Sequence, residues 1–297
     1  MSRRFTVAAA QYPLSFFRSW AEYQEKLDDW ISRGAAQGQL LVFPEYAGME
    51  LASLGGEAAA RDLQRSIETV SALRRDADAL HAALAARHGV YILAGSLPFV
   101  TSDGRPGNVA RLFTPGGAMG EQTKLMMTRF EDELWGVKPG AEVCVFETAL
   151  GRIGVAICFD VEFPLIVRAM AEAGAETILA PSCTDALHGY WRVRLGAQAR
   201  ALENQIHIVQ SPLVGDADWL TACDVNVGAA GVFGPPDKGF PPDGVVNVGQ
   251  MSAPGWVFSE IDLDKAAAVR ADGSVFNDRR WRDQPGAAPM SARVVAL

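Results

Sequence analysis

Cys158 occupies a position in this chain that suits a nucleophile. It ends the apolar run Ile153-Gly-Val-Ala-Ile157, and the polar residues and Pro164 that follow predict a strand end leading into a helix. The thiolate is the reactive form of cysteine, and a helix N-terminus or a neighbouring cation lowers the pKa of a thiol. The alternative interpretation is a small buried side chain, which is the usual role of a free cysteine. Cys158 alone leaves both interpretations open.

Two charged residues elsewhere in the chain could act with this cysteine. Glu45 follows an apolar strand-like run, and Lys124 leads into the apolar stretch Leu125-Met-Met127. Charged side chains at strand ends are usually only solvated, so neither residue indicates catalysis by itself. Together with Cys158 they would supply a proton carrier, a cation and a nucleophile from three distant parts of the chain. This combination favours a catalytic site.

The order and spacing of several short motifs resemble the nitrilase superfamily of carbon–nitrogen hydrolases. The resemblance extends from the first apolar run at Phe5 to about Phe258, which is most of the chain. Its motifs are Phe43-Pro-Glu45, Lys124, Pro139-Gly140, Cys158-Phe-Asp160 with Phe163-Pro164 behind it, Pro181-Ser182, and Ala199-Arg-Ala-Leu-Glu203-Asn204. The resemblance implies a catalytic triad of Glu45, Lys124 and Cys158.

The resemblance also implies a second glutamate between the lysine and the glycine turn, about one helical turn before an aromatic residue. Glu131, four residues before Trp135, fits this position best, and Glu133 is the alternative. For both glutamates the other interpretation is a solvated or ion-paired acid at the surface, because acids are rarely buried.

The chemistry of carbon–nitrogen hydrolysis explains these residue types. Glu45 would take the thiol proton as general base and return it to the leaving nitrogen as general acid. The Lys124 ammonium and the backbone N–H of Phe159 would stabilise the oxyanion of a tetrahedral intermediate, and losing such a donor costs roughly a hundredfold or more in rate. Glu131 would orient Lys124 and keep it charged, because an adjacent anion favours the ammonium form.

The residues after the nucleophile separate the branches of the superfamily. Nitrilases proper resemble Cys-Trp-Glu here, whereas Cys158-Phe159-Asp160 resembles the amidase-type branches. We therefore expect hydrolysis of a small amide to a carboxylate and ammonia through a cysteine thioester, with no metal and no cofactor. The alternatives are an N-carbamoyl compound hydrolase or a nitrilase with the same triad, and a catalytically silent relative that binds partners. The intact triad counts against the silent relative.

Glu162 departs from the resemblance, because many relatives carry at this position an arginine that can hold a substrate carboxylate. An acid repels a carboxylate in a desolvated pocket, so Glu162 disfavours N-carbamoyl amino acids and ω-amides of dicarboxylic acids as substrates. The alternative is an ion pair between Glu162 and an arginine such as Arg168. We expect the residues that contact the substrate to be Glu162, Tyr46, Trp135 and Cys183.

The histidines test a rival cysteine chemistry, because a Cys–His hydrolase needs an imidazole base. His81 and His88 lie in an alanine-rich stretch that predicts a helix, and His207 lies between two isoleucines in a predicted strand. His188 precedes Gly189-Tyr190 in a predicted loop and could approach a pocket, but it has no partner motif. A Cys–His mechanism is therefore the weaker interpretation.

Composition indicates a soluble, cytoplasmic protein, and the resemblance implies that its partner is a small-molecule amide substrate. A formal net charge of −8 and a pI of about 5.1 argue against nucleic-acid binding. The basic cluster Arg279–Arg282 is flanked by acids, which indicates a solvated or subunit-contacting patch. Four cysteines without Cys-x-x-Cys spacing argue against a zinc site and fit reduced thiols. The chain shows neither the apolar core of a signal peptide nor an apolar run of the roughly 18 residues that span a membrane.

Strand-like and helix-like runs alternate along the chain, which predicts the α/β class. The predicted strands are Thr6–Gln11, Leu40–Phe43, Val90–Ser96, Ala110–Thr114, Ile153–Cys158, Thr177–Ala180, Ile206–Ser211 and Val257–Ile261. The predicted helices are Ser19–Gly34, Ala58–His88, Pro164–Ala173 and Tyr190–Asn204. In the last helix Trp191, Leu195, Ala199 and Leu202 recur at helical spacing, which predicts a packed face.

One carbon–nitrogen hydrolase domain is expected over residues 1–264, because neither a Ser/Gly-rich linker nor a repeat divides it. The predicted C-terminal arm, residues 265–297, is either packed on a neighbouring subunit or loose. The resemblance implies a four-layer α-β-β-α sandwich with the triad at strand ends. It also implies a homodimer or higher homo-oligomer with subunit contacts near the nucleophile.

Overall fold

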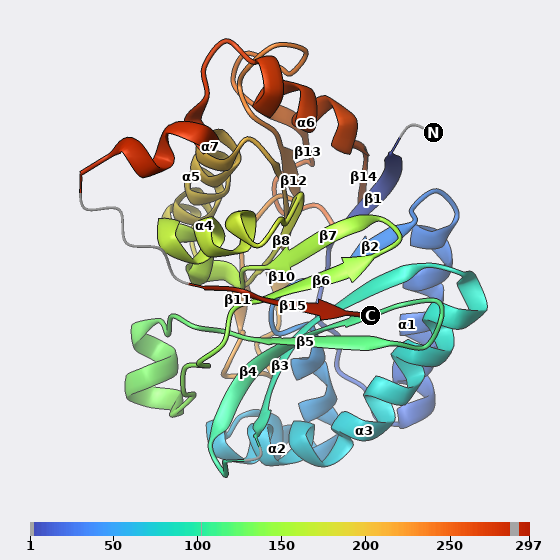
Figure 1. The fold of residues 1–297 in the computed structure, drawn as a ribbon. Coiled ribbons are helices and arrows are strands. Elements are labelled where there is room, and N and C mark those ends of the chain that lie inside the picture. Colours follow the sequence, from blue (N-terminus) through green and yellow to red (C-terminus); the bar gives the residue numbers. More distant parts are fainter. Residues whose placement is uncertain (1–2, 102, 286–290) are drawn as a thin grey trace.

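The computed structural model describes residues 3–101, 103–285 and 291–297, and two β-sheets form its centre (Figure 1). The first sheet contains, in spatial order, β14 (Gly255–Asp262), β1 (Arg4–Gln11), β2 (Leu40–Val42), β3 (Tyr91–Val100), β4 (Pro106–Phe113) and β5 (Met119–Thr123). The second contains β13 (Val245–Val248), β12 (Gly231–Phe233), β9 (His207–Pro212), β8 (Thr177–Ser182), β7 (Gly151–Val155), β6 (Cys144–Thr148) and β15 (Arg293–Ala296). A short ribbon pairs β10 (Gly215–Asp216) with β11 (Val225–Asn226).

Helices cover the outer faces of both sheets (Figure 1). On the first sheet lie α1 (Trp20–Ala35) and α3 (Leu63–His88), and on the second α4 (Pro164–Glu172) and α5 (Leu187–Asn204). The result is the predicted α-β-β-α sandwich, which is confirmed. Among the described residues, none of the helices combines the length and the apolar character that crossing a membrane requires.

Central strands are buried on both faces, which explains their continuous apolar runs. In β1, Val7 and Ala9 belong to the core between the two sheets, whereas Ala8 and Ala10 belong to the core under α1 and α3. This alternation follows from the two-residue period of a strand. Ile153 of β7 contributes to the inner core from the opposite sheet. Packing of the two sheets thereby fixes the strand ends that carry the predicted site.

Three local predictions are corrected by the structure. The predicted helix Ala58–His88 is interrupted after α2 (Glu57–Ala60), because the side chain of Asp62 accepts hydrogen bonds from the first turn of α3 and starts a new helix there. The predicted strand Ala110–Thr114 is the second half of the longer strand β4. His188, predicted in a loop, lies exposed in the first turn of α5.

The face of α5 that was predicted to pack is exposed within this chain. Trp191 is 45%, Leu195 59% and Leu202 40% exposed. The buried face of the helix instead carries Val193 and Ala197, which lie on the side turned toward the second sheet. The apolar stripe therefore lies on the outer surface.

The C-terminal segment packs on its own chain where the structure describes it. α6 (Leu263–Asp272) buries Leu263, Ala266 and Val269, and β15 pairs in parallel with β6. Residues 286–290 of the predicted arm lie outside the described residues. The division of the chain at residue 264 stays a prediction.

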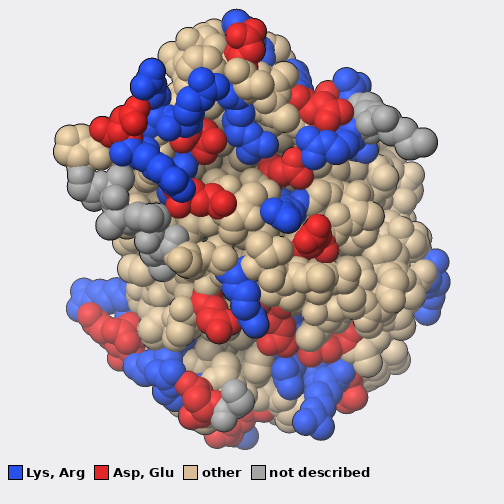
Figure 2. Space-filling model, in the orientation of Figure 1, with Lys and Arg blue, Asp and Glu red and all other residues tan. Residues whose placement is uncertain are grey.

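The basic cluster Arg279–Arg282 lies on α7 (Asn277–Arg280) and the 3-10 turn η4 (Trp281–Asp283). Arg280 pairs with Asp283 at 2.9 Å, and Arg282 pairs with Glu172 of α4 at 3.4 Å. Figure 2 shows basic and acidic side chains interspersed around α7. The cluster is therefore an ion-paired patch of the surface.

Candidate active site

Glu45 lies in the turn after β2 and is 1% exposed. The next residue, Tyr46, has a left-handed backbone conformation with a φ of 59°, and its N–H donates to the Ser96 hydroxyl at 3.0 Å. Gly95 allows the turn to come close, because a Cβ at that position would overlap the Pro44 carbonyl oxygen. The turn therefore holds Glu45 in one buried place.

Lys124 directly follows β5 and is as buried as Glu45. Its backbone N–H donates to the Asn108 carbonyl at 2.8 Å. Its Nζ lies 2.7 Å from Glu45 Oε1, and 2.8 Å and 2.7 Å from the two carboxylate oxygens of Glu131. One ammonium group thus bridges two carboxylates from distant parts of the chain.

The second of these carboxylates comes from η2 (Phe130–Trp135), a π-helical turn in which Glu131 is buried. The N–H and the hydroxyl of Thr128 each donate to Glu131 Oε2 at 2.8 Å and fix its orientation. Glu133, the alternative, is exposed and pairs with Arg129 at 2.7 Å. The structure therefore brings Glu131, and not Glu133, into the buried cluster.

Trp135 packs against Tyr46, which contacts the cluster. Its indole N–H donates to the Leu63 carbonyl at 2.9 Å, and its ring centre lies 5.0 Å from that of Tyr46. The Tyr46 hydroxyl in turn donates to Glu131. A substrate contact of Trp135 does not fit this position, because the ring is fully buried behind Tyr46.

Asn108 of β4 is a member of the cluster that the sequence does not reveal. It is fully buried, and its Nδ2 lies 3.0 Å from Glu45 Oε1 and 3.4 Å from Glu131 Oε1. The sequence shows only an amide beside the largely apolar run that forms the rest of β4, and this does not point to a role in the site. Such a residue is as often structural as functional, so only the tertiary contacts identify it.

Cys158 begins the 3-10 turn η3 (Cys158–Glu162), which follows β7. Its φ of 47° is left-handed, a conformation that costs a non-glycine residue about 1–3 kcal/mol. Its Sγ lies 3.6 Å from the Cys183 carbonyl oxygen, and the Cys183 N–H donates to Glu45 Oε2 at 3.0 Å. The backbone of Cys183 thus links the thiol to the carboxylate.

Asp160 fixes the turn that presents the thiol. Its carboxylate accepts hydrogen bonds from the N–H groups of Ile157 at 3.2 Å, Leu125 at 3.1 Å and Met126 at 2.7 Å. Burial raises the pKa of Asp160 to about 7, although a nearby ammonium and these N–H groups favour the ionised form. Asp160 therefore joins the segment after the lysine to the turn of the nucleophile.

Opposing effects set the charges of the buried cluster. Burial acts to lower the pKa of Lys124, but the carboxylates of Glu45 and Glu131 raise it well above its usual value. Burial acts to raise the pKa of Glu131, but Lys124 and the hydrogen bonds bring it below its usual value. Burial raises the pKa of Glu45, and Lys124 offsets this only in part. The cluster thus combines a cation, an anion and a carboxylate that readily takes a proton.

The Cys158 thiol does not have the lowered pKa that its position suggested. Burial raises this pKa well above its usual value, the Glu45 carboxylate raises it further, and Lys124 lowers it by less. Desolvation therefore outweighs the neighbouring cation. The resting thiol is protonated, so an attack by its sulfur needs a base.

The cluster opens into a cavity of about 400 Å³. Predicted site residues that line it are Glu45, Tyr46, Lys124, Glu131, Cys158, Phe159, Glu162 and Cys183. Phe159 lies in the first turn of η3, where backbone N–H groups lack partners within the helix. In the described part of the chain no histidine lines this cavity, and no group of three or more His, Cys, Asp or Glu side chains is arranged to bind a metal ion.

Glu162 lies on the cavity wall with its side chain 19% exposed. Its partner is Arg192 of α5, which also lines the cavity and whose Nε lies 3.6 Å from Glu162 Oε1. Arg168, the partner considered from the sequence, pairs instead with Glu172 at 3.1 Å and with Asp278 at 2.8 Å. Burial raises the pKa of Glu162, and Arg192 offsets this in part. The wall thus carries a loosely paired anion and cation.

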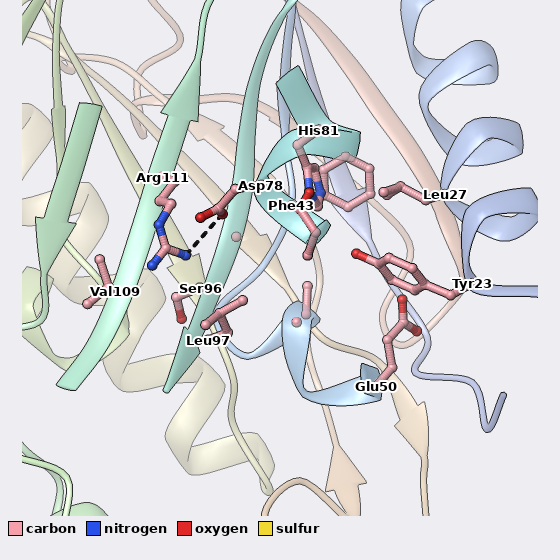
Figure 3. Close-up of a pocket in the computed structure, with 15 residues that line it drawn as sticks. Tyr23, Leu27, Phe43, Glu50, Asp78, His81, Ser96, Leu97, Val109 and Arg111 are labelled. Carbon is pink, nitrogen blue, oxygen red and sulfur yellow. Dashed lines mark hydrogen bonds and ion pairs between the residues drawn. The ribbon is translucent and has the colours of Figure 1, made fainter. Parts of the chain in front are cut away.

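A second cavity, drawn in Figure 3, has none of the predicted site residues in its lining. Tyr23, Asp78, His81 and Arg111 are among its lining residues, and Arg111 pairs with Asp78 at 3.3 Å. Burial lowers the pKa of His81 to about 4, so its ring is neutral. The volume of about 20 Å³ holds roughly one water molecule. This space is too small for a substrate.

The fold is an α-β-β-α sandwich of two sheets, and it carries a buried carboxylate–ammonium cluster beside a cavity-lining cysteine. Residues 6–226 match the family model of the carbon-nitrogen hydrolases, so the chain belongs to that family. The predicted membership of the nitrilase superfamily, amidase-type branch, is confirmed.

Known proteins resemble the chain over most of its length. The probable hydrolase YhcX of Bacillus subtilis (strain 168) is 33% identical over 277 residues, which are 92% of this chain and 53% of that protein. The deaminated glutathione amidase of Synechocystis sp. (strain PCC 6803 / GT-S) is 27% identical and covers 84% of this chain and 88% of its own. The carbon-nitrogen hydrolase from Helicobacter pylori G27 has a crystal structure with a TM-score of 0.74, 18% identity and 96% coverage of both chains. This chain spans about half the length of the B. subtilis relative. The H. pylori structure has the same fold as this chain.

Proposed function

We propose that this protein hydrolyses a small amide to a carboxylate and ammonia through a thioester on Cys158. The observation that carries the proposal is the placement of the Lys124 ammonium 2.7 Å from both Glu45 and Glu131 in a cavity that Cys158 also lines. A cation, a proton carrier and a nucleophile are the parts that acyl transfer needs. The family of this chain supports the reaction class.

The first half of the reaction forms the thioester. Glu45 takes the proton of the Cys158 thiol, whose raised pKa makes a base necessary, and the sulfur attacks the carbonyl carbon of the amide. The Lys124 ammonium and the Phe159 N–H stabilise the oxyanion that forms. Glu45 then gives its proton to the leaving nitrogen, the C–N bond breaks, and ammonia departs.

Water completes the reaction. Glu45 takes a proton from a water molecule, whose oxygen attacks the thioester carbon, and the C–S bond breaks as the carboxylic acid forms. Glu45 then returns its proton to the thiolate, and the acid loses its own proton to solvent, so the resting state returns. Glu131 takes part in neither proton transfer, because it holds Lys124 charged and in place through two contacts.

The charges on the cavity wall favour a substrate that carries an amine near the scissile amide. Outside the buried cluster, three acids line the cavity, Glu162, Asp185 and Asp224, against two cations, Arg129 and Arg192, and Arg192 is the one that pairs with Glu162. A protonated amine would offset the cost of the partly buried Glu162 carboxylate, whereas a carboxylate on the substrate would be repelled by it. The Arg192 side chain is 58% exposed, so solvent screens its charge more than that of Glu162.

A panel of substrates tests the reaction. Ammonia release is measured with simple amides, N-carbamoyl compounds and nitriles at equal concentration. We expect turnover of amides to exceed that of the other two classes. Faster turnover of carbamoyl compounds or nitriles would leave the triad in place but reject the amide as substrate. Absence of turnover in every class would instead support a silent relative that binds partners.

We further propose that the protein forms a homodimer or a higher homo-oligomer through the outer face of α5. The stripe of Leu187, Trp191, Leu195 and Leu202 is apolar and exposed, and such stripes mark contact surfaces. Light scattering during gel filtration measures the mass. We expect Leu195→Glu to reduce the mass to that of one chain and Val100→Glu, at an exposed apolar residue of β3, to leave it unchanged. A monomeric wild-type protein would contradict the proposal.

A cytoplasmic location is proposed on the state of the thiols. The cysteines are free, namely Cys144, Cys158, Cys183 and Cys223. Proteins of oxidising compartments tend to pair their cysteines, whereas cytosolic thiols stay reduced. Fractionation of the native cells tests the location, and recovery of the protein outside the cytoplasm would contradict it.

A further inference from the structure

We propose that Asn108 is a positioning residue whose amide holds Glu45 ionised and oriented between Lys124 and the nucleophile. The inference rests on the proposed function, in which Glu45 is the base. Asn108 is fully buried on β4, and its Nδ2 reaches Glu45 Oε1 at 3.0 Å and Glu131 Oε1 at 3.4 Å. The amide thus contacts both carboxylates of the cluster.

The hydrogen bonds of Glu45 show what the amide contributes. Oε1 faces two donors, Lys124 Nζ at 2.7 Å and Asn108 Nδ2 at 3.0 Å, and Oε2 accepts from the Cys183 N–H at 3.0 Å. Hydrogen bonds to a carboxylate favour its ionised form over its protonated form. Of the two side chains that donate to Glu45, Asn108 is the uncharged one. It therefore stabilises the Glu45 carboxylate without placing a second positive charge next to Lys124.

The orientation of the amide is determined by the carboxylates. Asn108 Oδ1 is buried and has no hydrogen-bond partner among the described residues. The opposite orientation would place Oδ1 against carboxylate oxygens and repel them. The amide nitrogen of Asn108 therefore faces the carboxylates and donates to Glu45 and Glu131.

The backbone of the same residue positions the ammonium. The Asn108 carbonyl accepts the Lys124 N–H at 2.8 Å, which fixes the start of the lysine segment against β4. One residue thus sets the place of both partners of the ion pair. The titratable groups that face Glu45 come from several elements, namely Tyr46, Lys124, Glu131, Cys158 and Cys183, and Cys223 lines the same cavity.

Two pH profiles test the proposal in the full-length protein. The first is kcat/KM for a simple amide, and the second is the rate of Cys158 alkylation by iodoacetamide, read by mass spectrometry. In Asn108→Leu, which has a similar volume and no donor, we expect the acid limb of both profiles to move up by about one pH unit, because a hydrogen bond to a charged group is worth roughly tenfold in such an equilibrium. KM on the plateau should change by less than about threefold.

Further variants separate this role from a structural one. Asn108→Asp adds a carboxylate beside Glu45 and should move the acid limb further than Asn108→Leu. Asn108→Ser keeps a small donor and should move it less, and it serves if the leucine variant fails to fold. Gln210→Leu is the matched control, because Gln210 is a buried amide of β9 whose polar atoms have no hydrogen-bond partner in the described part of the chain. The acid limb of this variant should stay at the wild-type pH.

Two outcomes decide the proposal. A loss of the same factor at every pH, with both acid limbs unmoved in all Asn108 variants, would reduce Asn108 to a structural residue. If the wild-type protein hydrolyses no amide, the proposed function fails, but the alkylation profile still tests Asn108, and we expect it to shift. The two failures are therefore distinguishable.

Discussion

Lys124→Met removes the cation that holds two buried carboxylates together. In the wild-type protein Lys124 is 1% exposed and contacts Glu45 and Glu131 at 2.7 Å. Breaking a buried ion pair by removing one partner costs about 3–5 kcal/mol of unfolding free energy, because the other charge is left buried. At about 2–4 °C per kcal/mol, the melting temperature should fall by roughly 6–20 °C at pH 8. Folded domains have about 5–15 kcal/mol of stability, so we expect the variant to fold.

The sign of the pH dependence follows from the two carboxylates. Without Lys124 their pKa values rise above those of the unfolded chain, so the folded state binds more protons than the unfolded state over the window between the two values. Stability then falls as pH rises through this window. The loss caused by Lys124→Met should therefore be smaller at pH 5 than at pH 8. Thermal melting followed by circular dichroism at the two pH values measures this difference.

Turnover provides the second readout of Lys124→Met. Loss of an oxyanion donor lowers kcat by roughly 10²–10³. Lys26→Met is the matched control, because Lys26 forms a mostly buried pair with Glu50 at 2.7 Å outside the site. It should lose stability and keep its turnover. Equal melting losses of Lys124→Met at both pH values, or wild-type turnover in that variant, would refute the assigned role.

Two other predictions concern carboxylates around the cavity. Glu45→Gln should abolish turnover, whereas Glu131→Gln should reduce it by a smaller factor because Glu131 transfers no proton. Glu133→Gln should leave turnover unchanged. Steady-state kinetics of the three variants test this order, and a reversed order would overturn the division of roles. Glu162→Gln should weaken the preference for amides with a cationic amine over amides with a carboxylate, and Arg192→Gln should strengthen it. Competition between the two substrates measures the ratio of their kcat/KM values. An unchanged ratio in both variants would assign the pair a structural role.

The ends of apolar runs were enough to locate two of the site residues, Glu45 and Cys158. Glu45 and Cys158 each follow a strand whose two faces are buried, so the chain must turn there and leave its next polar group at the sheet edge. Lys124 follows β5, a strand of mostly polar residues that are alternately buried and exposed. Such a sequence gives little indication of a strand. The family resemblance, more than periodicity, identified that lysine.

Other parts of the site depend on contacts that local sequence does not encode. Glu131 and Glu133 lie on the same turn, and only its π-helical winding against Lys124 separates them. Strand pairing brings Asn108 to the buried carboxylates, and helix placement brings Arg192 to the cavity wall, although these residues lie far from their partners in the chain. Periodicity on α5 showed an apolar stripe correctly, but it could not show that the stripe faces outward.

Mass spectrometry of acid-quenched reactions tests the central claim most directly. With an amide substrate in excess, we expect a mass increase equal to the acyl group on the peptide that contains Cys158, and its absence in Cys158→Ala. Cys144→Ser, at a buried cysteine of β6 outside the cavity, is the control and should retain the adduct. An acyl adduct on Cys144, Cys183 or Cys223 in place of Cys158, or undiminished turnover in Cys158→Ala, would contradict the account.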